Sequence, residues 1–239
     1  MVDVLNGVLH GAAVSARLPA GPLRFVPQAE LPPGEAYEAF IHRTACVPTR
    51  NNLHDLFNGL VWLARPALKA RLNALQAAEI QRVGVNAQRG RLRDALTLFD
   101  ENGAVLDGPT DLLAALAADL RARNWAALFI THRARWAHVR LTLIGHALQE
   151  QMASAPRKPL TAHLLVGDPL ALSGDDWASK PFLPLPVLGV PGWWPANEAP
   201  DFYADAAVFR PLRRDVQQAG NQARNQAANQ AGKKPSIDR

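Results

Sequence analysis

The chain has only one cysteine, Cys46, among its 239 residues. A single cysteine can form no internal disulfide and cannot build a thiolate-rich zinc cage, which favours a reducing compartment. No run approaches the roughly 18 apolar residues that span a bilayer. The first residues lack the basic leader and the continuous apolar block of a secretion signal. These absences predict a cytoplasmic protein without a membrane span.

Signatures of several enzyme classes are also missing. The sequence contains no Gly-x-Ser-x-Gly nucleophile motif and no glycine-rich phosphate loop. The formal net charge is +5, and residues 215–239 hold four basic and two acidic side chains, so they supply +2 of it. The rest of the chain is therefore only mildly basic, and its charge alone identifies no partner.

The richest cluster of polar residues lies between positions 48 and 84. Asn52 and Asp55 have the spacing of a helix N-cap and its third residue, which predicts a helix that begins at Leu53. Pro66 disfavours helical geometry at the residue before it and suits the first turn of a new helix. Two consecutive helices are therefore expected, the second over about residues 67–82.

The two sides of the first helix differ in character. Leu53, Phe57 and Leu60 recur at helical spacing, so this side is predicted to face the core. The remaining arc is a flank that faces solvent or lines a cleft. Its members are His54, Asp55, Asn58, Trp62 and Arg65.

Glu79 falls on the apolar stripe of the second helix. A carboxylate there is costly unless it is paired, protonated or bound to a cation, which makes Glu79 a candidate for function. The alternative is that the side chain bends out to water near the helix end.

A second cluster of this type lies further along the chain. Residues 139–143 fit a strand or a helix, but residues 145–152 are helical enough to place His146 and Glu150 on one face, four residues apart. Imidazole and carboxylate groups are ligands that zinc, manganese and iron accept. Neither this pair nor His54 with Asp55 matches a recognised metal signature.

These residues support a leading hypothesis of a hydrolase-like enzyme that uses a divalent metal or a carboxylate–histidine pair. The catalytic residues and metal ligands would be His54, Asp55, His146 and Glu150. The substrate-binding candidates are Asn58, Trp62, Arg65 and Glu79. We expect the first four to converge on one cleft, because two polar flanks are most easily satisfied when they face each other across a shared pocket. A separation above about 12 Å between His54 and the pair of His146 and Glu150 would exclude a single ion that joins them.

Two other functions fit parts of the sequence. Between residues 120 and 149 there are five arginines and no acid, with Trp125, Phe129 and Trp136 between them. Such a stretch can bind a nucleic acid or another phosphate-bearing ligand, although a solvated helix with inward aromatics has the same pattern. Alternatively, Trp193 and Trp194 could form the contact surface of a partner-binding scaffold.

The fold class predicted is α+β, a mainly helical single domain over residues 1–214. Its expected parts are a Pro-rich wrapping arm (1–47) with a short helix near 34–43, a hairpin of strands 95–100 and 104–106 around Asn102-Gly103, a helix from Thr110, a strand at 160–166 and a long Pro/Trp loop (181–200). Residues 215–239 contain no aromatic residue or leucine, so this Gln/Asn/Ala-rich tail is expected to be disordered.

Four blocks in order resemble a known family: TRNNLHDLFNGLVWL, RDALTLFDENG, GHALQE and PGWWPAN with FYADAAVFRP. They are similar to the bacterial domain of unknown function 3025. The resemblance covers most of residues 24–213 and implies a soluble bacterial protein with no assigned activity. It transfers no catalytic residue, and it stops before the tail.

Overall fold

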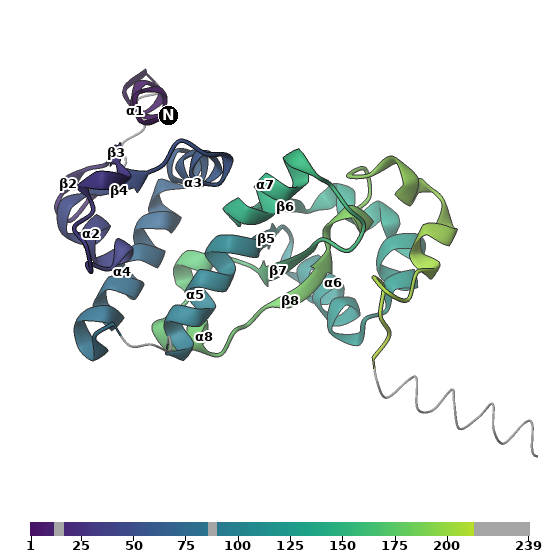
Figure 1. Cartoon of the computed structure of the whole chain (residues 1–239). Coiled ribbons are helices and arrows are strands. Elements are labelled where there is room, and N and C mark those ends of the chain that lie inside the picture. Colours follow the sequence, from purple (N-terminus) through teal and green to yellow (C-terminus); the bar gives the residue numbers. More distant parts are fainter. Residues whose placement is uncertain (12–16, 86–89, 213–239) are drawn as a thin grey trace, which may run out of the picture.

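The computed structural model describes residues 1–11, 17–85 and 90–212. Helices predominate and the strands form small sheets, so the predicted α+β class is confirmed (Figure 1). The helices are α1 (Val2–Gly11), α2 (Tyr37–Thr44), α3 (Leu53–Ala64), α4 (Pro66–Val83), α5 (Arg91–Asn102), α6 (Thr110–Ala122), α7 (His146–Ser154) and α8 (Gly174–Ala178). The strands are β1 (Arg17–Leu18), β2 (Gly21–Pro22), β3 (Arg24–Pro27), β4 (Cys46–Thr49), β5 (Gly103–Asp107), β6 (Arg140–Leu143), β7 (Thr161–Val166) and β8 (Leu183–Pro186). The tail at 215–239 lies outside the described residues.

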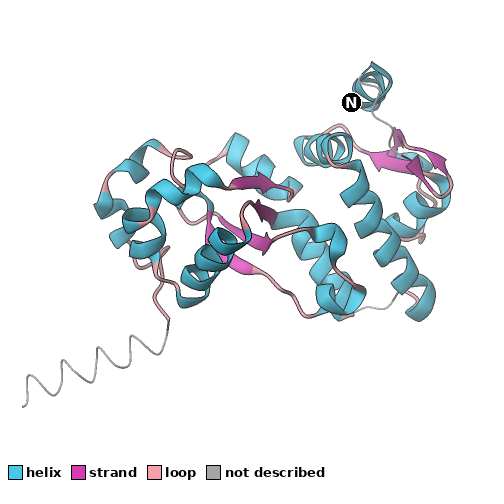
Figure 2. Cartoon of the chain, turned by 180° about the vertical axis from the view of Figure 1, so that it is seen from behind, coloured by secondary structure: helices cyan, strands magenta, loops and turns pink. Residues whose placement is uncertain are grey.

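A four-stranded mixed sheet forms the centre of the C-terminal half, in the order β6, β5, β7, β8. Strands β5 and β7 are parallel, and each edge strand is antiparallel to its neighbour. Side chains alternate along β5, so Ala104 and Leu106 pack with Leu116 of α6, whereas Val105 packs with Phe99 of α5. Helices therefore cover both faces of this sheet (Figure 2).

The N-terminal arm has more regular structure than its prolines predict. It begins with the ten-residue helix α1, and β3 pairs in parallel with β4. The short helix expected near residues 34–43 is present as α2. Leu5 of α1 and Phe25 of β3 pack with Trp62 of α3 in one hydrophobic cluster. The arm and α3 therefore share a core.

The hairpin predicted at Asn102-Gly103 is wrong. Residues 95–100 belong to helix α5, because Leu96 and Phe99 lie at helical spacing and are fully buried. Gly103 ends this helix in an extended conformation, with φ −75° and ψ 151°. A side chain at Gly103 would collide with the carbonyl oxygen of Phe99, so the glycine permits a direct change from helix to strand.

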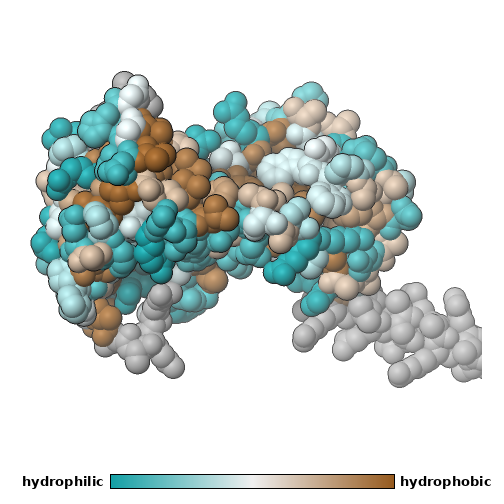
Figure 3. All heavy atoms as spheres, turned by 45° about the horizontal axis from the view of Figure 1, so that its top comes forward, coloured by the Kyte–Doolittle hydropathy of each residue, from teal (hydrophilic) through white to brown (hydrophobic). Residues whose placement is uncertain are grey.

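Helix α3 is capped as predicted, since the Asn52 side chain accepts a hydrogen bond from the Asp55 N–H at 2.8 Å. The core face predicted for this helix is wrong. Leu53 and Leu60 are 52% and 40% exposed, whereas Asn58 on the polar flank is 9% exposed. The polar flank can be buried because its partners satisfy its hydrogen bonds. Apolar surface accordingly gathers over the α1 and α3 side of the molecule (Figure 3).

The Pro/Trp loop is ordered and lies against the C-terminal core. It contains β8, an edge strand, where proline is tolerated because one side of the strand needs no ladder hydrogen bond. The fully buried Asn197 side chain donates to the carbonyl oxygens of Leu188 and Val190 at 2.8 and 2.7 Å. Trp193 and Trp194 are partly buried against the same core. The tryptophans therefore anchor the loop.

A central hydrophobic cluster joins the two halves of the molecule. It combines Val61 of α3 and Leu72 of α4 with Phe99 of α5, Leu165 of β7 and Trp177 of α8. Phe99 and Trp177 meet edge to face, with ring centroids 4.9 Å apart. The cluster therefore fixes the position of α5 between the N-terminal helices and the sheet. Within the described residues, none of the helices is both long and apolar enough to cross a membrane.

We predict that Gly145→Ala destabilises the protein by roughly 2 kcal/mol, as overpacking of a tight contact does. A Cβ atom at Gly145 would lie 2.5 Å from the backbone nitrogen of Asn102, and backbone cannot move aside cheaply. Chemical denaturation measures the change. Gly7→Ala in α1 is the matched control, since a Cβ there meets nothing within 4 Å. Equal stability of the two variants would contradict this packing.

Candidate metal centre

Two backbone hydrogen bonds join the end of α5 to the start of α7. The N–H groups of Ile144 and Gly145 both donate to the carbonyl oxygen of Gly103, at 2.9 and 2.8 Å. His146, the first residue of α7, is thereby held beside Glu101 in the last turn of α5. The first turn of α3 packs against α7, so three helix ends meet at one place (Figure 1).

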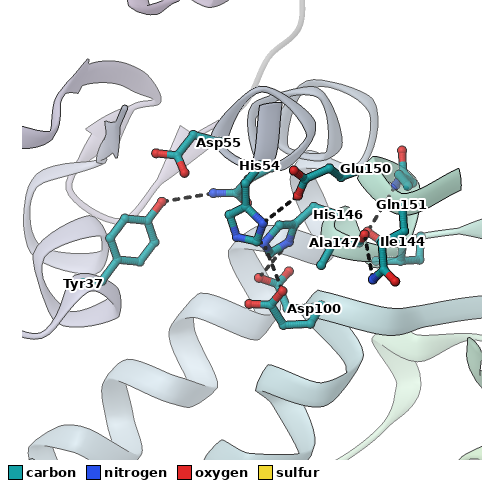
Figure 4. Close-up of polar contacts among 12 residues, drawn as sticks. Tyr37, His54, Asp55, Asp100, Ile144, His146, Ala147, Glu150 and Gln151 are labelled. Atoms are coloured by element: carbon teal, nitrogen blue, oxygen red, sulfur yellow. Dashed lines mark hydrogen bonds and ion pairs between the residues drawn. The ribbon is translucent and has the colours of Figure 1, made fainter. Parts of the chain in front are cut away.

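The imidazoles of His54 and His146 face each other at this junction (Figure 4). Their Nε2 atoms are 3.0 Å apart, and the ring planes are inclined by 72°. Two imidazole nitrogens at this distance either share one proton or direct both lone pairs at one cation. Metal–nitrogen bonds of about 2.0–2.1 Å permit the second arrangement.

Glu101 completes a group of three potential ligands. One carboxylate oxygen of Glu101 lies 3.6 Å from Nε2 of His146. A ligand atom from each of His54, Glu101 and His146 lies within 4.8 Å of the other two. This set of two imidazoles and one carboxylate is typical of catalytic zinc and of non-haem iron.

A carboxylate also lies beside the second nitrogen of each histidine. Glu150 Oε2 is 3.2 Å from Nδ1 of His54, within hydrogen-bond distance. Asp100 Oδ2 is 3.7 Å from Nδ1 of His146, an ion-pair distance, and this nitrogen has no hydrogen-bond partner among the described residues. Metal-binding histidines commonly face a carboxylate in this way, because the carboxylate fixes the tautomer and the ring orientation.

Burial sets the charge of His146, which is 4% exposed. Loss of solvent lowers the pKa of His146, and the nearby Asp100 carboxylate opposes this effect only in part. The ring is therefore held in the neutral form, which is the form that binds a metal. Lys69 lowers the same pKa further.

Behind the histidines lies a buried polar network. Lys69, 5% exposed at its side chain, forms a salt bridge with Asp100 and donates to the Asn58 side-chain oxygen at 2.8 Å. Asn58 in turn donates to the Tyr37 hydroxyl at 3.1 Å. Burial raises the pKa of this hydroxyl well above its usual value, so it stays protonated. A continuous chain of polar contacts thus links Tyr37 to His146.

The junction opens into a cavity of about 450 Å³, within the usual size range of ligand sites. The helices α2, α3, α4, α5 and α7 all contribute to its walls. The histidines and Glu101 lie in its lining with Tyr37 and Asn58. The candidate ligands are therefore accessible to a small molecule.

The structure brings together three of the four residues predicted as ligands, namely His54, His146 and Glu150. Asp55 also lines the cavity, but its carboxylate points away from the imidazoles (Figure 4). It accepts hydrogen bonds from Arg50, at 2.6 Å from the backbone N–H and at 3.1 and 2.9 Å from the guanidinium. Asp55 therefore orders the entry to α3 and does not reach the junction.

Of the four predicted substrate-binding residues, only Asn58 lines this cavity. Trp62 is 1% exposed in the N-terminal core, and Arg65 lines a different cavity near β5 and β6. Glu79 forms a bidentate salt bridge with Arg82 near the end of α4. That salt bridge satisfies the carboxylate whose burial made Glu79 a candidate.

Sequence reasoning did not select Glu101, Asp100 or Lys69. The hairpin predicted around Asn102-Gly103 puts the two acids at its turn, whereas they occupy the last turn of α5. Two adjacent acids near a helix C-terminus are unusual, because the helix dipole there disfavours negative charge. This pattern in the sequence could have marked them as candidate functional residues. The burial of Lys69 depends on tertiary contacts, which the residues around it in the sequence do not indicate.

A family model described as "Protein of unknown function (DUF3025)" matches residues 23–169 and 166–213. These matches cover most of the chain, so the protein belongs to this family, and the resemblance noted in the sequence is confirmed. No curated protein and no solved structure matches the chain. The family carries no assigned activity, and function must be inferred from the site.

The aromatic residues that the nucleic-acid hypothesis requires for base stacking are buried. Trp125, Phe129 and Trp136 are 8%, 0% and 7% exposed, so their faces are not available to bases. Arg133 is engaged by Glu198 and by the Tyr203 hydroxyl. This agrees with the other interpretation of the pattern, in which the aromatic residues turn inward.

We predict that Lys69→Met lowers the free energy of unfolding by about 3–5 kcal/mol, because it leaves the buried Asp100 carboxylate without its cation. Adding Asp100→Asn should restore part of the loss. Arg82→Met is the control: its salt bridge with Glu79 has a 69% exposed arginine, and solvent screening should make its loss far less costly. Urea denaturation compares the variants. Similar losses for Lys69 and Arg82 would count against the buried network.

Proposed function

We propose that this protein is a metal-dependent hydrolase whose metal ligands are His54, His146 and Glu101. The observation that carries the proposal is the pair of facing Nε2 atoms, 3.0 Å apart, with a Glu101 oxygen 3.6 Å from one of them. Three ligands of this kind at one edge of a cavity leave positions open for water and substrate. Structural zinc sites, in contrast, have four protein ligands and are closed.

In such a site the ion would supply the chemistry, by lowering the pKa of a bound water and by polarising the bond to be hydrolysed. The protein residues around it have separate tasks. Glu150 orients the His54 imidazole through a hydrogen bond at Nδ1, whereas the Asp100 carboxylate, 3.7 Å from Nδ1 of His146, acts on that ring by its charge. Lys69 holds Asp100 in place from the buried side. These three are positioning residues.

Tyr37 and Asn58 are placed to contact a substrate. The Tyr37 hydroxyl accepts a hydrogen bond from Asn58, which leaves its own hydrogen for a group in the cavity. Because burial keeps this hydroxyl protonated, it acts as a hydrogen-bond donor at neutral pH. Hydrolysis adds the hydroxyl of water to the substrate's acyl or phosphoryl group and a proton to the leaving group. With its single cysteine, the protein would work in the cytoplasm.

The prediction is that the metal-free full-length protein takes up one equivalent of Zn²⁺ or Co²⁺ per chain. His54→Ala, His146→Ala and Glu101→Gln should each weaken binding at least tenfold, because each removes one of three ligands. Equilibrium dialysis with elemental analysis gives stoichiometry and affinity. The absorption spectrum of bound Co²⁺ reports the ligand set.

Two controls sharpen this experiment. His138→Ala removes an exposed histidine outside the cavity and should leave uptake unchanged. Asp55→Asn should also retain the metal, because Asp55 is paired with Arg50. Wild-type protein that takes up no divalent metal, or a Glu101→Gln variant that binds as tightly as wild type, would refute the proposed centre. Iron in place of zinc in the purified protein would favour an oxygenase over a hydrolase.

A further inference from the structure

One arginine in the cavity has no counter-ion at contact distance. Arg93 lies in the first turn of α5 and lines the same cavity as the candidate metal centre. Within the described part of the chain, its guanidinium makes no salt bridge, and its buried Nε has no hydrogen-bond partner. Buried donors in folded proteins are normally satisfied, so this nitrogen points to a missing acceptor.

The other cations of this region are already engaged. Arg50 is held by the Asp55 carboxylate, and Lys69 is held by Asp100. Two carboxylates interact with Arg93 at longer range: Glu79, which is paired with Arg82, and Glu38, which also lines the cavity. The Glu38 carboxylate accepts a hydrogen bond from the Asn73 side chain at 2.6 Å and makes no salt bridge in the described chain. Arg93 is therefore the cation of this lining that remains for a ligand.

The geometry of α5 sets the distance between Arg93 and the metal centre. Arg93, Thr97 and Glu101 recur every four residues along one face of the helix, and all three line the cavity. With a rise of 1.5 Å per residue, Arg93 and Glu101 are about 12 Å apart along the helix axis. One small molecule in the cavity could thus contact the guanidinium with one end and the metal with the other.

The surroundings of Arg93 suit a charged group on a partly apolar molecule. Ile80 of α4 and Leu31 lie in the same lining and make part of its wall apolar. A guanidinium in such a setting binds planar or tetrahedral oxyanions through paired N–H donors, and reduced hydration strengthens these bonds.

We propose that the substrate carries an oxyanion, a carboxylate or a phosphate, that is bound by Arg93 at the end of the cavity away from the bond that is cleaved. This inference rests on the proposed function for the position of that bond, but the anion site itself does not need the metal. Arg93 would be a specificity-determining residue, since it selects molecules with an anionic group at that end.

The test is isothermal titration calorimetry of the full chain with phenylphosphonate and with benzoate, each in the metal-free and the zinc-loaded state. Wild-type protein should bind at least one probe in both states. Arg93→Gln should weaken this binding at least about tenfold, the usual effect of losing a charge-assisted hydrogen bond, and Arg93→Lys should weaken it less. Binding of one probe alone identifies the group as phosphate-like or carboxylate-like.

Arg82→Gln serves as the matched control, because Arg82 is an exposed arginine outside the cavity. This substitution should leave probe binding unchanged. Thermal unfolding confirms that each variant is folded. Zinc uptake by Arg93→Gln should equal that of wild type. Failure of zinc uptake in wild type overturns the hydrolase alone. Failure of both probes to bind wild type, or equal binding by Arg93→Gln and wild type, overturns the anion site.

Discussion

The candidate site depends on one backbone contact, the close approach of the end of α5 to the start of α7. Two N–H groups share the carbonyl oxygen of Gly103, and Gly145 lies too near Asn102 to carry a side chain. This contact extends the antiparallel pairing of β5 with β6 by one step, and it brings Glu101 beside His146. With it, a helix C-terminus that bears two acids faces a helix that begins with a histidine, and α3 adds His54 from the third side.

The charges of this site lower the stability of the fold, and their retention indicates a function. A buried lysine, a buried histidine and several carboxylates lie close together, and each loses solvation on folding. The Lys69 salt bridge compensates Asp100, but the His146 Nδ1 atom remains without a hydrogen-bond partner in the described chain. A hydrophobic cluster would stabilise the fold equally well. Buried ionisable groups concentrate at sites that bind or transform a ligand. A cation between the Nε2 atoms would balance the charge of the surrounding carboxylates.

The sequence predicts local structure better than it predicts which groups are buried. Helix α3 begins at its predicted cap, and the i, i+4 spacing places His146 and Glu150 together, because both depend on residues near one another in the chain. The buried face of α3 could not be predicted, since Asn58 is satisfied by Tyr37 and Lys69, which are distant in sequence. Glu101 was overlooked for a related reason: Asn-Gly typically marks a hairpin, and here it ends a helix.

The most direct test is a crystal structure of the zinc-loaded protein with diffraction data collected on both sides of the zinc absorption edge. Our account predicts one anomalous peak between the imidazoles, about 2.0–2.2 Å from Nε2 of His54, Nε2 of His146 and an oxygen of Glu101. It also predicts that Glu150 and Asp100 remain on the opposite nitrogens of the two rings. Two histidines that hydrogen-bond directly to each other with no peak between them, or a peak located elsewhere, would contradict it.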